Sequence, residues 1–218
     1  DVARRLPLPR RYQEQGLMRY GFHGISYEYI TSAVPAYNDG ELPTRLIAAH
    51  LGNGASLCAI EEGVGIATTM GFSTLDGIMM GTRCGAIDPG VLLHLMHQEG
   101  LGESQLSELV YNQCGLLGVS GLSADMQVLL NSNDVRAEEA IALFCYSVVQ
   151  ALGSLITVMA GLDGLVFTGG IGEHAAAVRA RVCGKLEWLG LVLDEAANLN
   201  NGALISAPDS AIKVWVIP

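Results

Sequence analysis

The stretch His50-Leu51-Gly52-Asn53-Gly54-Ala55-Ser56 decides how the rest of this sequence is interpreted. It joins two short apolar runs, residues 46–49 and 57–60, through an Asn-Gly pair. Asn-Gly is a strong signal for a tight β-hairpin, because both central residues of such a turn need a positive φ. Residues 64–70 predict a third strand, so one interpretation is an ordinary three-stranded meander.

The polar content of this first turn favours a second interpretation. Gly52 and Gly54 allow backbone N–H groups to approach an anion closely. His50, Asn53 and Ser56 add side-chain donors to the same turn. The residues are therefore consistent both with a plain turn and with a phosphate-binding hairpin.

Length and composition are typical of a globular α/β domain. The chain has 218 residues, half of them apolar and 27 of them glycine, which is enough to bury a core. Its net charge of −10 argues against nucleic acid and against a membrane surface as partners. Five cysteines without CxxC spacing predict free thiols in a reducing, cytoplasmic compartment, and no zinc site.

Two segments need a separate interpretation. Residues 1–25 hold five of the twelve basic residues and lack the apolar run of a signal peptide. We interpret them as an irregular, solvated leader and hinge-side segment, followed by a core over 26–218. Residues 140–162 carry no formal charge over 23 positions, a length that can span a bilayer. Internal polar residues and acidic flanks favour a core or subunit-interface helix instead.

Two glycine-punctuated loops carry polar side chains. His23 lies on a turn between Gly21 and Gly24, before a helix that we expect to begin at Ser26, and it is either catalytic or incidental. Arg83 lies in the long loop 71–85, where it either binds a phosphate or carboxylate or pairs with Asp88 at the surface.

Further helices are predicted in the second half of the chain. One begins at Asp88-Pro89, and others cover residues 103–113, 123–131 and 135–161. Asp125 is expected to cap the third of these or to contact a ligand. A strand at 165–168 leads into a Gly-Gly-Ile-Gly turn and a helix to about residue 188, a pattern that is typical of an anion or nucleotide site.

Five stretches, taken together and in order, resemble the acetate kinase family, which includes propionate and butyrate kinases. They are RYGFHGIS (19–26), HLGNGAS (50–56), TMGFSTLDGIMMGTRCGAIDPG (69–90), SGLSADM (120–126) and FTGGIGEH (167–174). The resemblance implies an α/β lobe of the actin-like ATPase fold (sugar kinase and actin type, ribonuclease H-like). Its core would be β-β-β-α-β-α-β, with a mixed five-stranded sheet from strands at 46–50, 57–61, 64–70, 164–168 and 212–217.

The resemblance also implies the domain organisation. Residues 1–218 would form a single C-terminal nucleotide-binding lobe, without the N-terminal lobe and the C-terminal tail of the family. The helix over 135–161 would lie at or near the contact of a homodimer.

The same resemblance implies site residues. The catalytic pair would be His23, against the transferring phosphoryl group, and Arg83, which neutralises its charge. The nucleotide would lie against residues of three loops: His50, Gly52, Asn53, Gly54, Asp125, Met126, Gly169, Gly170, Ile171 and Gly172. The implied reaction moves the γ-phosphoryl of ATP, bound with Mg²⁺, to a short-chain carboxylate such as acetate or propionate.

The sequence departs from the family pattern at three places. Gln127 replaces an arginine after the SGxSxDM turn, and Thr74 replaces a proline that lines the substrate pocket. The chain also ends at Pro218, before a segment whose glutamate serves the family's metal site. A nucleotide-binding or dimerisation module without turnover therefore stands beside the kinase interpretation, and a sugar kinase of the same fold is a third alternative.

Overall fold

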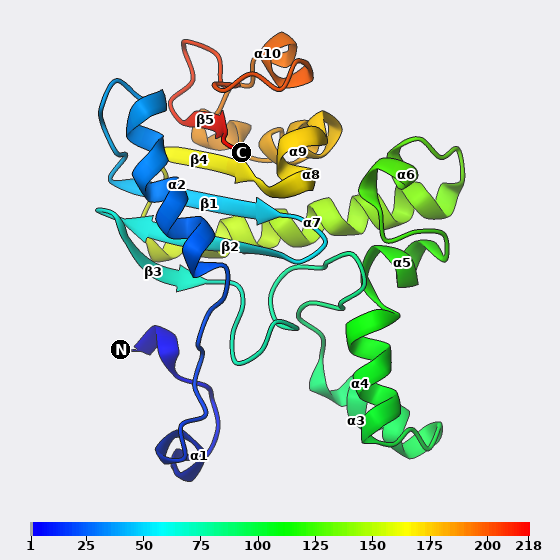
Figure 1. Ribbon diagram of the computed structural model, residues 1–218. Coiled ribbons are helices and arrows are strands. Elements are labelled where there is room, and N and C mark those ends of the chain that lie inside the picture. Colours follow the sequence, from blue (N-terminus) through cyan, green and yellow to red (C-terminus); the bar gives the residue numbers. More distant parts are fainter. Residues whose placement is uncertain (1) are drawn as a thin grey trace.

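A five-stranded mixed sheet forms the centre of the molecule, which this computed structural model describes over residues 2–218 (Figure 1). The strand order is β3-β2-β1-β4-β5. β2 pairs antiparallel with both β1 and β3, whereas β4 pairs parallel with both β1 and β5. The strands are Arg45–Leu51 (β1), Ala55–Glu61 (β2), Val64–Thr68 (β3), Gly164–Thr168 (β4) and Lys213–Val216 (β5). The predicted β-β-β-α-β-α-β order and the mixed sheet are confirmed.

Helices fill the connections around this sheet. The helices before β4 are η1 (Val2–Arg4), α1 (Arg10–Glu14), α2 (Gly24–Tyr37), α3 (Pro89–Gln98), α4 (Glu103–Asn112), α5 (Gly115–Ser120), α6 (Met126–Leu130) and α7 (Val135–Val158). Those after β4 are α8 (Gly169–His174), α9 (Ala176–Cys183), η2 (Glu187–Leu189) and α10 (Glu195–Leu199).

Both faces of the sheet are covered, because its central strand is apolar on each side. Leu46 and Ala48 of β1 belong to the cluster that packs under α2, together with Ile30 and Trp215. The alternate residues of β1 face a second, larger cluster with α7 and α9. Figure 1 shows α2 on one face of the sheet and α7 on the other.

The long helix α7 is amphipathic in its packing, although it is apolar nearly all round. By length and composition alone it could cross a membrane, a property that it shares with core helices of water-soluble proteins. One side, including Phe144 and Val148, is buried against the sheet and its neighbouring helices. The other side leaves Leu143 and Tyr146 exposed. The core position expected for this helix is therefore confirmed for one of its faces.

The first hairpin forms where Asn-Gly predicts it, but with a different turn. β1 and β2 remain in register up to Leu51 and Ala55, so Gly52, Asn53 and Gly54 form a three-residue connection. None of these three residues has a positive φ. The positive φ pair occurs in the second hairpin instead, at Glu62 (49°) and Gly63 (80°). The expected Asn-Gly conformation was wrong because the first loop packs on other loops, as described below.

Helix boundaries show which local signals were decisive. Asp88 caps α3 by accepting a 2.8 Å hydrogen bond from the Gly90 N–H, with Pro89 in the first turn, as predicted. The prediction that Ser26 caps α2 was wrong, because the helix begins at Gly24 and His23 is its N-cap. The predicted glycine turn over residues 169–174 is itself helical (α8), and the helix expected after it, to about residue 188, is divided into α9 and η2.

The N-terminal segment is less irregular than predicted. Within the expected leader, η1 and α1 form two short helical turns, and α1 begins directly after Pro9. Neither of them buries a residue, which agrees with the prediction of a solvated segment.

Candidate functional site

The β1–β2 loop packs against the glycine-rich loop that carries Arg83. The Gly81 N–H donates a 3.1 Å hydrogen bond to the Asn53 carbonyl. A Cβ atom on Gly54 would lie 3.3 Å from Nη1 of Arg83, so the guanidinium covers this glycine closely. Two loops that are about thirty positions apart in the sequence therefore form one surface.

Arg83 has no carboxylate partner among the described residues, 2–218. Its Nη1 donates to the Thr74 carbonyl at 3.3 Å and approaches the Met80 sulfur at 3.7 Å. The alternative prediction, a surface pair with Asp88, was wrong because Asp88 is used to cap α3. The guanidinium therefore retains N–H groups that can bind an anion bidentately. Thr74, predicted in the substrate pocket, holds Arg83 through its backbone.

His23 lies next to His50 at the end of β1. The two imidazole rings are stacked, with centroids 4.3 Å apart and planes inclined by 25°. His23 Nδ1 is 2.7 Å from Ser56 Oγ, and His50 Nδ1 is 3.0 Å from Ser26 Oγ. His23 also has a left-handed backbone (φ 62°), which a helical continuation of α2 would not allow. Both rings are thus fixed by partners on other elements.

The surroundings of the two rings favour the neutral form of each. Burial, followed by the His50 ring and the Arg83 guanidinium, lowers the pKa of His23 to about 4. Burial also lowers the pKa of His50. The Glu173 carboxylate has the opposite, smaller effect on this pKa. The electrostatic effect of Arg83 on His23 indicates that these two predicted catalytic residues are near each other.

We expect the stability of this chain to rise with pH between about 4 and 6.5. An unfolded chain protonates His23 near the ordinary pKa of 6.5, whereas the folded chain does so near 4. Between these values the unfolded state binds more protons, so acidification favours unfolding. Urea unfolding of the wild type and of His23→Gln at pH 4.5 and pH 7 measures this effect. The stability difference between the two proteins should change with pH, and a constant difference would contradict the shift.

Six of the ten predicted nucleotide residues border one hollow of about 560 Å³. Three separate loops contribute to it: the β1–β2 loop, the start of α6, and α8. From the predicted set it is lined by Gly52, Asn53, Asp125, Met126, Gly170 and Ile171. The remaining lining residues are Ala124, Gln127, His174 and Ala175. Of these, Gln127 had been noted as a departure from the family pattern, and His174 ends the FTGGIGEH stretch.

The other predicted nucleotide residues do not line this hollow. Gly169 has a φ of 76° and its backbone packs against Leu51, so it makes the turn out of β4 possible. Gly172 is buried beside Phe167. His50 and Gly54 lie toward His23 and Arg83 instead. Asp125 both borders the hollow and caps α6, accepting a 2.7 Å hydrogen bond from the Gln127 N–H.

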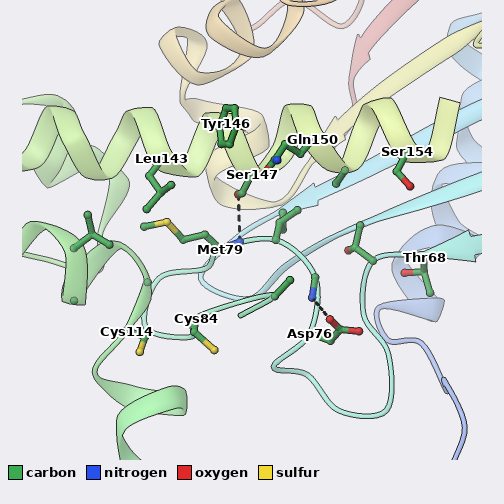
Figure 2. A pocket seen from close by; sticks show the side chains of 18 of the residues that line it. Thr68, Asp76, Met79, Cys84, Cys114, Leu143, Tyr146, Ser147, Gln150 and Ser154 are labelled. Carbon is green, nitrogen blue, oxygen red and sulfur yellow. Dashed lines mark hydrogen bonds between the residues drawn. The ribbon is translucent and has the colours of Figure 1, made fainter. Parts of the chain in front are cut away.

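A larger hollow, of about 800 Å³, lies between the loop that follows β3 and the exposed side of α7. Figure 2 shows Leu143, Tyr146 and Ser147 of α7 over this space, with Cys84 and Cys114 opposite. Ser147 Oγ accepts a 3.2 Å hydrogen bond from the Met79 N–H, which fixes the loop to the helix. None of the predicted catalytic or nucleotide residues lines this hollow, so size alone would have selected a different site.

Known proteins resemble this chain over its whole length. The model of the acetokinase family matches residues 2–218. An acetate kinase of Rhodopseudomonas palustris is 52% identical over 225 residues, covering 100% of this chain and 56% of the relative. An acetate kinase of Rickettsia akari is 45% identical with the same coverage. The chain therefore spans about half the length of the curated relatives that it matches.

Solved structures agree with this result. The crystal structure of Porphyromonas gingivalis acetate kinase superposes with a TM-score of 0.95 at 38% identity, over 100% of this chain and 56% of that one. A propionate kinase from Francisella tularensis superposes with a TM-score of 0.93 at 33% identity, over 99% of this chain and 56% of that one. From its motifs, its fold and these similarities, the chain belongs to the acetokinase family, the family of the acetate kinases.

Proposed function

We propose that this chain is the nucleotide-binding lobe of a phosphotransferase that moves the γ-phosphoryl group of ATP to the carboxylate of a short-chain fatty acid. Acetate is the first candidate acceptor and propionate the second, and the reaction is reversible. The observation that supports this most is the meeting of Gly52–Asn53, Asp125–Met126 and Gly170–Ile171 around one hollow. His23 and Arg83 adjoin the same β1–β2 loop.

The proposed reaction requires groups of the kind that this site contains. A carboxylate oxygen attacks the γ-phosphorus, the bond from that phosphorus to the bridging oxygen breaks, and ADP leaves with the electron pair. The acceptor is already an anion, so no strong base is required. Catalysis then depends on alignment and on neutralising charge on the equatorial oxygens. Arg83 supplies a cation that has no carboxylate partner among residues 2–218, and His23 supplies a ring whose pKa is lowered, which suit these two tasks.

Magnesium would enter this site with the nucleotide. The described residues contain no group of three or more potential metal-ligating side chains. Mg²⁺ in kinases is commonly held by substrate phosphates and one or two carboxylates, so a preformed protein cage is not needed. When bound, it would screen the charge of the β- and γ-phosphates.

Filling the hollow at Gly170 is expected to abolish nucleotide binding and leave the fold intact. A Cβ atom on Gly170 meets no protein atom within 4 Å, and the residue borders the hollow. Gly170→Leu would therefore occupy ligand space without displacing the protein, and we expect the Kd for Mg-ADP to rise at least about 100-fold. Calorimetric titration of this chain measures it.

Gly153→Leu is the matched control for that substitution. Gly153 lies on α7, outside the hollow, and also has no neighbour within 4 Å of a Cβ atom. The control should bind Mg-ADP like the wild type. Equal binding by Gly170→Leu would place the nucleotide elsewhere, and absence of binding by the wild type would refute the proposed nucleotide site.

Phosphoryl transfer is tested by trapping acyl phosphate with hydroxylamine. ATP, Mg²⁺ and acetate, propionate or butyrate are supplied to this chain and to a version with the length of its relatives. Product from the longer version alone supports the proposal and ranks the acids. Absence of product from both would favour a nucleotide-binding or dimerisation module.

The proposal also covers the oligomeric state of the protein and its cellular compartment. The exposed side of α7, with Leu143 and Tyr146, is the surface that we assign to a homodimer contact. Five cysteines without a disulfide among residues 2–218 agree with a cytoplasmic protein.

A further inference from the structure

Two side chains near His23 form a hydrogen-bonded chain with it that the proposed reaction does not yet use. Ser56, on β2, has its Oγ 2.7 Å from Nδ1 of His23. The same Oγ is hydrogen bonded to the hydroxyl of Tyr27, on α2. Ser56 is completely buried and Tyr27 is 7% exposed, so water does not compete for these contacts. Strand β2 and the first turns of α2 hold all three groups in place.

Counting protons restricts the direction of these two hydrogen bonds. Each bond contains one proton, and the serine and tyrosine hydroxyls supply one each. If Tyr27 donates to Ser56 and Ser56 donates to His23, both protons are placed and Nδ1 of His23 is an acceptor. If Nδ1 donates instead, only one of the two hydroxyl protons lies in these bonds, and the other, from either Ser56 or Tyr27, needs a further acceptor.

The arrangement in which Nδ1 of His23 donates is less favourable, because it requires this further acceptor. The Thr68 hydroxyl interacts with Tyr27 and donates its own proton to the Leu57 carbonyl at 3.0 Å. It would have to accept from Tyr27 as well. The Tyr27 hydroxyl is hydrogen bonded to Ser56 Oγ, and the Thr68 hydroxyl is a further side-chain hydrogen-bond partner of Tyr27. The first arrangement needs no contact beyond the two that are present, and a buried donor without a partner is costly.

We propose that Ser56 and Tyr27 are positioning residues that hold His23 in the tautomer protonated at Nε2. The ring then offers an N–H donor on the edge opposite Ser56, rather than a lone pair. Its plane is held by stacking on His50, which is hydrogen bonded to Ser26 in turn. Two rings are therefore fixed by hydroxyls of α2 and β2.

The value of this tautomer for catalysis rests on the proposed function. Phosphoryl oxygens only accept hydrogen bonds, so a neutral histidine contributes to their binding only through an N–H. The other tautomer would place a lone pair against the phosphoryl oxygen and repel it. Holding the proton on Nε2 gives a donor while the ring carries no charge.

The tautomer is measured directly by NMR on this chain with ¹⁵N-labelled histidine, without nucleotide. Long-range ¹H–¹⁵N correlation at pH 7 distinguishes a protonated from an unprotonated ring nitrogen, and His23→Gln assigns the signals. We expect Nδ1 of His23 to be unprotonated and Nε2 to be protonated. A protonated Nδ1, or averaged signals of a tautomer mixture in the wild type, would overturn the proposal. This outcome does not depend on whether the chain binds nucleotide.

Two variants test the roles of the hydroxyls. Ser56→Ala removes the donor to Nδ1, and Tyr27→Phe removes the proton that orients Ser56. Both should shift the His23 signals toward a tautomer mixture, whereas unchanged signals in both would refute the assignment. Ser32→Ala is the matched control, because its hydroxyl donates to the Glu28 carbonyl of the same helix and has no other hydrogen-bond partner among the described residues. If Ser56→Ala does not fold, the wild-type spectrum and Tyr27→Phe still decide.

Discussion

Replacing Arg83 by alanine is expected to lower kcat about 1,000-fold, in a protein with the full length of the acetate kinases that this chain matches. That factor corresponds to about 4 kcal/mol of transition-state stabilisation. Arg83 carries a cation without a carboxylate partner among residues 2–218, and it lies beside Gly54 and His23. It does not border the hollow assigned to the nucleotide. We therefore expect the Kd for Mg-ADP to change less than threefold.

The hydroxylamine assay and a nucleotide titration separate these two effects. Arg181→Ala is the control, because Arg181 pairs with Glu138 at the exposed surface and touches none of the proposed site residues. It should leave kcat and Kd unchanged. A large rise in Kd with an unchanged kcat for Arg83→Ala would show that Arg83 serves nucleotide binding rather than transfer.

Arg179→Ala is expected to have the largest effect on folding, about 4 kcal/mol of lost unfolding free energy. Arg179 is completely buried, and burial lowers its pKa. Its guanidinium donates to the carbonyls of Gly172 and Glu173, to the side chain and carbonyl of Asn198, and to the side chain of Asn201. Truncation leaves these acceptors unsatisfied and opens a cavity. Because Gly172 and Glu173 belong to α8, nucleotide affinity should fall as well.

Urea unfolding measures this loss, and the chain provides a close control. Arg181→Ala removes an arginine from the same helix, but one whose ion pair is exposed, and such pairs contribute about 0–1 kcal/mol. Arg179→Lys should be intermediate, since three ammonium donors replace five. A loss below about 1 kcal/mol for Arg179→Ala would mean that water or rearranged side chains satisfy the exposed carbonyls.

Several elements were predictable because their signals are local. Short apolar runs predicted the strands, and the Asp88-Pro89 pair predicted the start of α3 through a hydrogen bond that spans two positions. Asp125 caps α6 in the same local manner. The five glycine-rich stretches indicated the family because each of them keeps its chemistry within a few residues.

The sequence indicated which residues to consider for the candidate site. It did not indicate which of them border the hollow and which pack against other parts of the protein. The sequence names His23, Arg83 and the three nucleotide loops together. The tertiary structure separates Gly52, Asn53 and Gly170, which border the hollow, from Gly169 and Gly172, which only make tight packing possible. A glycine that faces a ligand and a glycine that faces a buried strand are the same residue type, so their sequence cannot distinguish them.

The sequence by itself determined the sheet, the caps of α3 and α6 and the family of this protein. Only the tertiary structure decided the conformation of the Asn53 turn and the partners of Arg83 and Arg179. It also decided the hydrogen bonds that join Tyr27 and Ser56 to His23. Those partners are 29 and 33 positions apart in the sequence, and Arg179 reaches Asn198 across 19 positions. Such contacts arise only after strand register and helix packing have fixed where each backbone lies, and no local preference specifies them.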